Sequence, residues 1–160
     1  QRCLVKETDK AGFSMLSHAR DNGDPIIFYR PWKEPATLCA RWTGSQWEEK
    51  AVPFGFKEIE KLGPDAFRVY GSRRGDLAWW ESRDGGKSWK QAGSLALPGK
   101  GFSQCILIDD FHPDVRLFIK HDDRWNPKRY IGKDLILVAG ADPGPAGDSA
   151  GSPRAGASAR

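Results

Sequence analysis

The sequence lacks the features that define several large protein classes. Its 160 residues include one methionine and three cysteines, and no two cysteines have the C-x-x-C spacing of a zinc or redox site. No apolar run approaches the ~20 residues of a membrane-spanning helix, and no lysine–arginine run has the length of a nucleic-acid-binding arm. We therefore expect no membrane and no nucleic acid as partners. We expect Cys3, Cys39 and Cys105 to be buried free thiols, because each lies in an apolar run.

Turn residues and aromatic side chains are abundant instead. The chain contains 18 glycines, 11 prolines and 7 tryptophans, and helical periodicity is nearly absent. Short β-branched or aromatic runs alternate with turn residues about every ten positions, which is typical of all-β sandwiches and propellers. We predict strands at 13–18, 25–30, 37–42, 46–52, 57–62, 67–71, 77–81, 88–92, 104–108, 115–120 and 135–138.

These strands belong to a repeat. The segments 27–29, 38–42 and 46–48 are matched in turn by 68–70, 77–80 and 88–90. The offset is 41 residues between Tyr29 and Tyr70 and 42 residues between Trp47 and Trp89. A period of about 40 to 50 residues with four short strands per unit is typical of a β-propeller. A third unit begins near residue 104 and weakens after Tyr130.

The sequence therefore predicts an all-β fold, a partial β-propeller of about two and a half four-stranded antiparallel blades, over residues 1–142. Residues 143–160 are mainly Gly, Pro, Ala and Ser without an aromatic side chain, so we predict a disordered tail there. A closed ring needs roughly four to eight blades. We expect the remaining blades upstream of Gln1, and the alternative is that copies of the chain assemble.

Residues 82–89, Ser-Arg-Asp-Gly-Gly-Lys-Ser-Trp, match the pattern S-x-D-x-G-x-x-W. Asp84 can accept hydrogen bonds from turn N–H groups, Gly86 permits a positive φ, and Trp89 can pack onto the sheet. This motif resembles the Asp-box, or bacterial neuraminidase repeat, of sialidase-like β-propellers. The resemblance implies a structural role in the turn between the third and fourth strands, away from the active face. The residues that carry this role are Ser82, Asp84, Gly86 and Trp89.

The family to which this resemblance points includes sialidases, other glycosidases, polysaccharide lyases and non-catalytic binding proteins. The Gly-Asp-Pro turn leading into Ile-Ile-Phe-Tyr-Arg, at residues 23–30, looks most like the polysaccharide-lyase branch. The resemblance therefore implies a carbohydrate-active fragment that acts on an acidic polysaccharide, by lyase chemistry as the first choice. A sialidase-type glycoside hydrolase acting on a sialoglycan and a non-catalytic glycan- or protein-binding propeller stay open as alternatives. Tyr29-Arg30-Pro31 is one residue short of the sialidase F/Y-R-x-P signature.

No cofactor and no metal site are expected from the spacing of the His, Cys and Asp residues. If the full-length protein processes glycans, a secreted or periplasmic location is favoured.

Strand direction predicts which loops meet. Antiparallel strands place the turns between strands one and two and between strands three and four at one end, and the other connections at the opposite end. The end opposite the 82–89 motif collects basic and aromatic residues, which suit an anionic glycan because arginine binds carboxylates and indole rings stack on sugars. The candidate substrate-binding residues are Arg30, Trp32, Arg73, Arg74, Arg124 and Trp125, and the candidate catalytic residues are His121, Tyr29 and Tyr70. The alternative is that these are solvated loop residues and, for the tyrosines, packing residues at matched strand positions.

Overall fold

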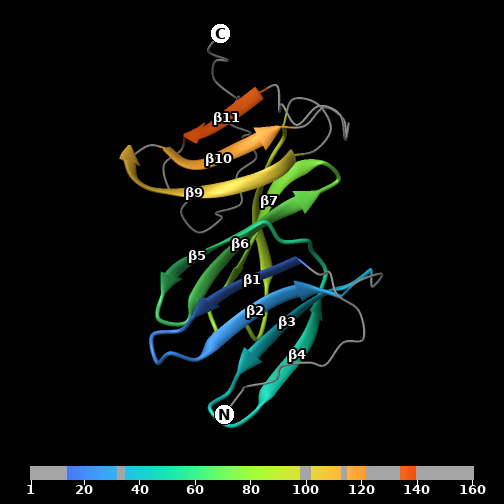
Figure 1. Cartoon of the computed structure of the whole chain (residues 1–160), viewed down its shortest axis with the longest axis vertical. Helices are drawn as coiled ribbons and strands as arrows, with labels where there is room; N and C mark the ends of the chain where they lie inside the picture. The colour runs from blue at the N-terminus through green and yellow to red at the C-terminus, as the bar shows by residue number, and fades with distance from the viewer. Residues whose placement is uncertain (1–13, 32–34, 98–101, 113–114, 122–133, 140–160) are drawn as a thin grey trace.

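The computed structural model describes residues 14–31, 35–97, 102–112, 115–121 and 134–139. Within these ranges all regular secondary structure is β-strand, in three antiparallel sheets. The predicted all-β class is confirmed, and the sheets form an open stack consistent with part of a propeller (Figure 1). The described part of the chain contains no helix long and apolar enough to cross a membrane. The expected tail at 143–160 lies outside the described residues.

The first sheet has the order β1-β2-β3-β4, with β1 Ser14–Ala19, β2 Pro25–Arg30, β3 Thr37–Trp42 and β4 Trp47–Val52. The second sheet has the order β5-β6-β7-β8, with β5 Glu58–Gly63, β6 Ala66–Arg73, β7 Asp76–Ser82 and β8 Lys90–Leu95. The third sheet has the order β11-β10-β9, with β9 Phe102–His112, β10 Val115–His121 and β11 Asp134–Ala139. Each hairpin joins neighbours in sequence, so the short runs seen in the sequence pair locally.

The strand bounds agree closely with those expected, and the largest difference is in β9. This strand continues to His112, past the predicted end at residue 108, because His112 still pairs with Val115 across a tight hairpin. A register shift between Val115 and Leu117 accommodates the extra residues. Pairing with β10 therefore overrides the local turn preference of this Asp-rich segment.

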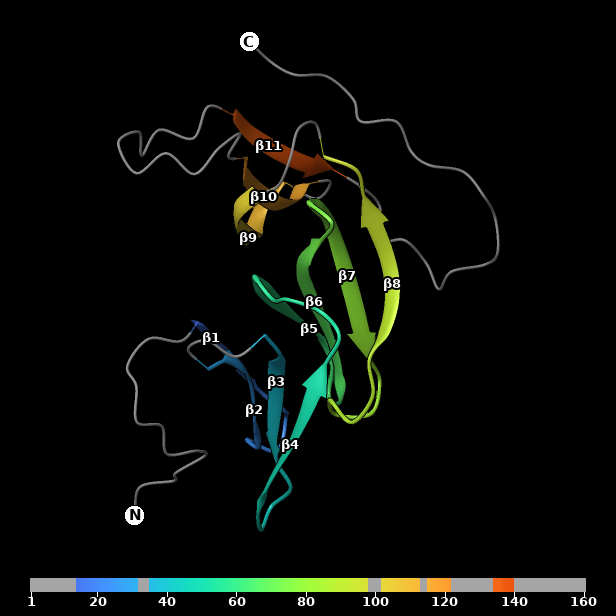
Figure 2. The same cartoon turned by 90° about the vertical axis from the view of Figure 1, so that its right-hand side faces the viewer.

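The first strands of the three sheets lie side by side in series. β1 contacts β5, and β5 contacts β9 (Figures 1 and 2). The ends of β1, β5 and β9 lie along one side of the stack, on the left in Figure 1, and the ends of β2, β6 and β10 lie along the other. This is the arrangement of successive propeller blades, in which the first strands surround the central axis.

Aromatic side chains fill the interface between the first and second sheets. Phe28 is fully buried and contacts Trp89 edge to face, with ring centroids 5.2 Å apart. Phe54 stacks on Trp80 at 4.5 Å. The other buried members of this core are Ile26, Cys39, Val52, Ile59, Phe67, Val69 and Ala78.

A second core lies between the second and third sheets. Its buried residues are Tyr70, Leu77, Leu97, Phe102, Cys105, Leu117 and Ile119. Cys39 and Cys105 are thus free, buried thiols, one in each core, and burial raises the pKa of each to about 12. Cys3 lies outside the described residues.

The expectation that Tyr29 and Tyr70 occupy matched positions is wrong. Phe28 packs into the first core, so its neighbour Tyr29 faces the opposite side of the first sheet. Tyr70, in contrast, packs into the second core and faces the third sheet. A shift of one residue in the alignment of two strands reverses the face. Phe28, and not Tyr29, therefore shares the direction of Tyr70.

Candidate functional site

The 82–89 turn is held by its own hydrogen bonds. Asp84 accepts hydrogen bonds from the backbone N–H of Ser88 at 3.0 Å and from the Ser88 and Ser82 hydroxyls at 2.5 and 2.8 Å. The backbone N–H of Gly86 donates to the Ser82 hydroxyl at 2.9 Å. Gly86 has φ of 85°, a conformation that side-chain-bearing residues rarely adopt. The turn joins β7 to β8, the third and fourth strands of the second sheet.

The hydrogen bonds of this turn favour the ionised form of Asp84. Burial by itself would raise the pKa of Asp84, but the hydrogen bonds from Ser88 and Ser82 outweigh it and lower the pKa to about 2. Trp89, at the end of the turn, donates its indole N–H to the carbonyl of Gly86 at 3.2 Å and packs on Phe28 and Phe54 of the first core. The S-x-D-x-G-x-x-W spacing thus places Ser82 and Asp84 where they hold the turn by hydrogen bonds, and Trp89 where it packs on the first core.

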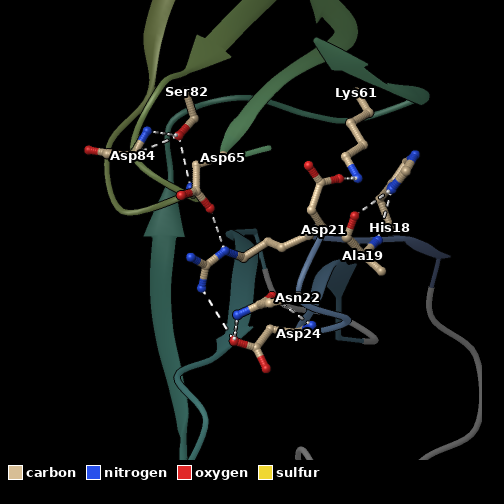
Figure 3. Close-up of polar contacts among 11 residues, drawn as sticks. His18, Ala19, Asp21, Asn22, Asp24, Lys61, Asp65, Ser82 and Asp84 are labelled. Atoms are coloured by element: carbon tan, nitrogen blue, oxygen red, sulfur yellow. Dashed lines mark hydrogen bonds and ion pairs between the residues drawn. The ribbon is translucent and has the colours of Figure 1, made fainter. Parts of the chain in front are cut away.

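Neighbouring sheets are also linked at this end (Figure 3). The Arg20 guanidinium, in the β1–β2 turn, pairs with the Asp65 carboxylate of the β5–β6 turn at 2.6 Å. The backbone N–H of Gly85 donates to the Asp65 carbonyl at 2.9 Å, which joins the 82–89 turn to the same point. Lys61 forms a further ion pair with Asp21. The polar groups at this end therefore serve contacts between sheets.

A shallow pocket opens beside the same turn, between it and the β3–β4 hairpin. It is lined by Cys39, Arg41, Glu48, Glu49, Lys50, Gly86 and Lys87. No residue proposed for catalysis or substrate binding lines it. Arg41 and Glu48 pair with each other across the hairpin. The pocket therefore offers charges that largely neutralise one another, and it does not coincide with the candidate site.

Arg30 ends β2 at the opposite end of the stack, where its side chain is exposed. Its Nη2 donates to the hydroxyl of the buried Thr37 at 3.4 Å, which orients the guanidinium. The connection after β4 passes close to it, since a Cβ added to Gly55 would lie 3.5 Å from Arg30 Nη2. The same connection lies against β6, because Gly71 lacks a Cβ that would collide with the Gly55 carbonyl. One arginine is thus oriented beside a loop of the next sheet.

Arg73 and Arg74 lie at the corresponding end of the second sheet, both exposed. Arg74 and Gly75 form the two-residue connection from β6 to β7, with φ of 56° and 95°. Positive φ at both positions is the type I′ hairpin, which favours Asn or Gly, so an arginine there is unusual. Arg73 donates to the Gln91 side chain. The tight turn presents the Arg74 guanidinium at the tip of the hairpin.

The other proposed site residues are only partly described. His121 ends β10 and therefore lies at the same end as Arg30 and the 74–75 turn. Trp32, Arg124 and Trp125 lie outside the described residues.

The two tyrosines are buried. Tyr29 is 6% exposed and donates to Glu49, and Tyr70 is 4% exposed and donates to Glu60 at 2.7 Å. Burial raises the pKa of Tyr70 well above its ordinary value, and the hydrogen bond to Glu60 adds to this rise. A polymeric substrate cannot reach either phenol in this conformation. The end of the sheets opposite the 82–89 turn is called the loop end. Among the described candidates, the side chains that lie exposed there are Arg30, Arg73 and Arg74.

A polar cluster between the second and third sheets was not predicted from the sequence. We call it the Arg68 cluster, and it comprises Arg68, Glu60, Glu81, Tyr70 and Arg116. Arg68 is 5% exposed and pairs with Glu81 at 2.6 Å and Glu60 at 3.5 Å. Arg116 of the third sheet reaches Glu60 at 2.5 Å. Burial lowers the pKa of Arg68, but its hydrogen bonds to Tyr70 and Glu81 outweigh that effect and raise it.

A signal for this cluster was present in the sequence. Arg68 interrupts an apolar run, Phe67-Arg68-Val69-Tyr70, and hairpin register places Glu60 and Glu81 directly opposite it. An arginine flanked in this way on a central strand is expected to be buried and paired.

The loop end can bind anions. Its described basic side chains, Arg30, Arg73 and Arg74, can donate charge-assisted hydrogen bonds to carboxylates. Within the described residues no group of three or more His, Cys, Asp or Glu side chains is placed to hold a metal ion. The chemistry available from these three arginines is therefore recognition of negative charge.

Comparison with known proteins yields a partial similarity. The chain is 28% identical over 88 residues to an ulvan lyase of Nonlabens ulvanivorans, a match that covers 49% of this chain and 19% of that protein. The chain thus spans about a fifth of the length of this relative. No family model matches the chain, and no solved structure matches it. The similarity is to a polysaccharide lyase, whereas nothing in these comparisons identifies an Asp-box or a sialidase.

Proposed function

We propose that this chain is part of a carbohydrate-active β-propeller that acts on an acidic polysaccharide by lyase chemistry. The similarity to an ulvan lyase carries the proposal. It is supported by the position of Arg30, Arg73 and Arg74, which lie exposed at the end of the sheets opposite the 82–89 turn. That turn and its neighbours use their polar groups internally, so the loop end is where substrate would bind.

Lyase chemistry requires two kinds of group. The negative charge of a uronate carboxylate must be neutralised, so that the adjacent carbon becomes acidic enough to lose a proton. Arginine guanidinium groups supply that neutralisation through paired hydrogen bonds. A general base must then remove the proton, and a histidine with an ordinary pKa of about 6.5 is suited to this near neutral pH. The electron pair of the broken C–H bond forms a C=C bond as the bond from the next carbon to the glycosidic oxygen breaks, and that oxygen takes up a proton from the protonated base or from water. We assign the base to His121, because both tyrosines are buried.

The activity test uses uronate-containing glycans. Elimination creates an unsaturated sugar whose ultraviolet absorbance reports the reaction, and sialosides serve as the competing substrate class. Absorbance that rises with uronate-containing glycans supports the proposal. Sialoside cleavage without elimination would establish a hydrolase instead. Binding of acidic glycans with no product would indicate a non-catalytic propeller.

Substitutions locate the site. We expect Arg30→Ala and Arg74→Ala each to lower kcat/KM at least about ten-fold, because each removes a charge-assisted hydrogen bond. Arg83→Ala is the matched control, since Arg83 is also an exposed arginine and lies in the 82–89 turn at the other end. His121→Ala should lower kcat about a hundred-fold or more while substrate binding persists. Loss of activity in Arg83→Ala with full activity in Arg30→Ala would place the site at the end that carries the 82–89 turn and would contradict the proposal.

A further inference from the structure

The turn between β6 and β7 contains an unfavourable backbone conformation. Within the described ranges, Arg74 is the one residue other than glycine that has a positive φ, at 56°. In this region the Cβ of an L-residue lies too close to the following carbonyl oxygen, so glycine and asparagine are favoured there. Arg73 pairs with Asp76 across the hairpin, which leaves Arg74 and Gly75 as its two central positions. An Asn-Gly turn would form the same hairpin at lower cost, so the arginine strains the turn.

No contact within the described part of the chain compensates for this strain. Arg74 is exposed, and its guanidinium has no hydrogen bond or ion pair with a described residue. The other arginines in the described ranges each donate to a side chain, and they are Arg20, Arg30, Arg41, Arg68, Arg73, Arg83 and Arg116. The adjacent Arg73 carries the same charge and so does not stabilise Arg74. The Arg74 guanidinium is therefore available to an anion from outside the chain.

Arg74 differs in this respect from Arg30. The Arg30 guanidinium is held by the Thr37 hydroxyl and lies beside Gly55, so it is fixed in place before a ligand arrives. A fixed donor suits the developing charge of a reacting group. Arg74 lies at the tip of a hairpin on the next sheet, three residues beyond the point where β6 meets the Gly55 loop, roughly 10 Å along the strand. The two arginines therefore offer separate points of contact to a long anionic ligand.

We propose that Arg74 forms a separate anion subsite, which binds the carboxylate of a sugar other than the one that reacts. This inference rests on the proposed function, since it assigns the ligand to an acidic polysaccharide. A contact remote from the reacting sugar stabilises the bound substrate and the transition state equally, so it changes KM and leaves kcat unchanged. Only a glycan long enough to carry a second carboxylate to the hairpin tip gains from this contact.

Stability measurements test the strain. In the full-length protein that contains this chain, Arg74→Asn should raise the melting temperature by about 1 to 4 °C, because asparagine tolerates a positive φ. Arg73→Asn is the matched control, since Arg73 is the neighbouring arginine and has no positive φ. That change should not raise the melting temperature. If Arg74→Asn gives no rise, the turn is not strained by its arginine, and the proposal loses its first support.

Binding measurements test the subsite. Titration calorimetry with polyglucuronate should show an affinity about ten-fold lower for Arg74→Asn than for the wild type, the usual loss for a charge-assisted hydrogen bond. The affinity for a glucuronate disaccharide should be the same in both proteins. Arg74→Lys, which keeps the charge, should restore part of the polymer affinity, and Arg83→Asn, at the other end of the sheets, should leave it unchanged. Unchanged polymer affinity in Arg74→Asn, or an equal loss with the disaccharide, overturns the subsite.

Kinetics separate this proposal from the proposed function. With a glycan that the wild type cleaves, Arg74→Asn should raise KM about ten-fold and leave kcat within about two-fold, whereas Arg30→Ala should lower kcat. A wild-type protein that binds polyglucuronate through Arg74 but forms no unsaturated product overturns the lyase function and supports the subsite. A lyase whose KM does not depend on Arg74 supports the function and overturns the subsite. A wild-type protein that does not bind the polymer also overturns the subsite.

Discussion

The two interfaces between the sheets are built from different chemistry. The interface between the first and second sheets is apolar, with Phe28, Phe54, Trp80 and Trp89 in ring contact. The interface between the second and third sheets combines an apolar core with the Arg68 cluster, in which Arg68 itself is buried and Arg116 is exposed. Both serve the same purpose, because a single sheet of this size cannot bury its own two faces.

This difference predicts how each interface fails. The apolar interface depends on filled volume, so removing a large ring leaves a cavity. The charged interface depends on complete pairing, because a buried charge that loses its partner is costly even where the whole set could be replaced at little cost. The first interface should therefore respond to side-chain size and the second to charge.

The largest effect is expected in the apolar interface. Phe28→Ala should lower the free energy of unfolding by about 3 to 5 kcal/mol, because Phe28 is fully buried and contacts three other rings. Urea unfolding followed by tryptophan fluorescence measures the change. Ile27→Ala, at the half-buried neighbouring position on the opposite face, is the control and should cost clearly less. Equal losses would show that the first interface carries no special share of the stability.

The charged interface should respond almost as strongly, but to charge. Arg68→Leu should cost about 3 kcal/mol, since it keeps an apolar stem and leaves Glu60 and Glu81 buried without their shared partner. Adding Glu60→Gln and Glu81→Gln should restore part of the loss, because amides carry no uncompensated charge. If the triple variant is less stable than Arg68→Leu by urea unfolding, the cluster does not behave as a charge-balanced unit.

The first interface was easier to foresee from the sequence than the second. The short runs around Phe28 and Val69 predict strands because pairing is local and the side-chain period is two. The side of the sheet on which Tyr29 lies was predicted wrongly. A one-residue shift in the alignment of the two repeats places a side chain on the opposite side of the sheet, and only the packed sheets show which alignment is correct. Within the Arg68 cluster, hairpin register could have predicted the pairing of Arg68 with Glu60 and Glu81. The contact with Arg116 could not be predicted, because Arg116 comes from another sheet and no local pattern encodes that contact.

The loop end, too, was predicted only in part from the sequence. Arg30, Arg73 and Arg74 were placed at one end by strand alternation alone, and the structure has them at strand ends there. The support of Arg30 by Thr37 and the positive φ of Arg74 depend on how the hairpins close. These features follow from tertiary register and could not be derived from composition or spacing.

A smaller effect is expected at the 82–89 turn, which borders the apolar interface through Trp89. Asp84→Ala should cost about 1 to 3 kcal/mol, because the N–H and hydroxyl groups of Ser88 lose their acceptor. The pKa of Asp84 is about 2 in the folded chain, below the ~3.9 of an unfolded aspartate. Its contribution is therefore present above about pH 4 and lost as the pH falls toward 2. Thermal melts of wild type and Asp84→Ala should converge over this interval, and curves that stay parallel would contradict the assignment.

The smallest effect is expected where the charges that link two sheets are exposed. Lys61 and Asp21 connect the first and second sheets with side chains 28% and 56% exposed, whereas Arg116, itself 44% exposed, pairs with Glu60, which is only 14% exposed. Lys61→Ala should therefore change the free energy of unfolding by no more than about 0.5 kcal/mol, and high salt should remove even this difference. Arg116→Ala, measured beside it, should cost more and keep most of its effect in salt, because Glu60 loses a partner within the interface. Equal, salt-sensitive losses in the two variants would mean that the Arg68 cluster behaves as a surface ion pair, and the distinction between the two interfaces would not hold.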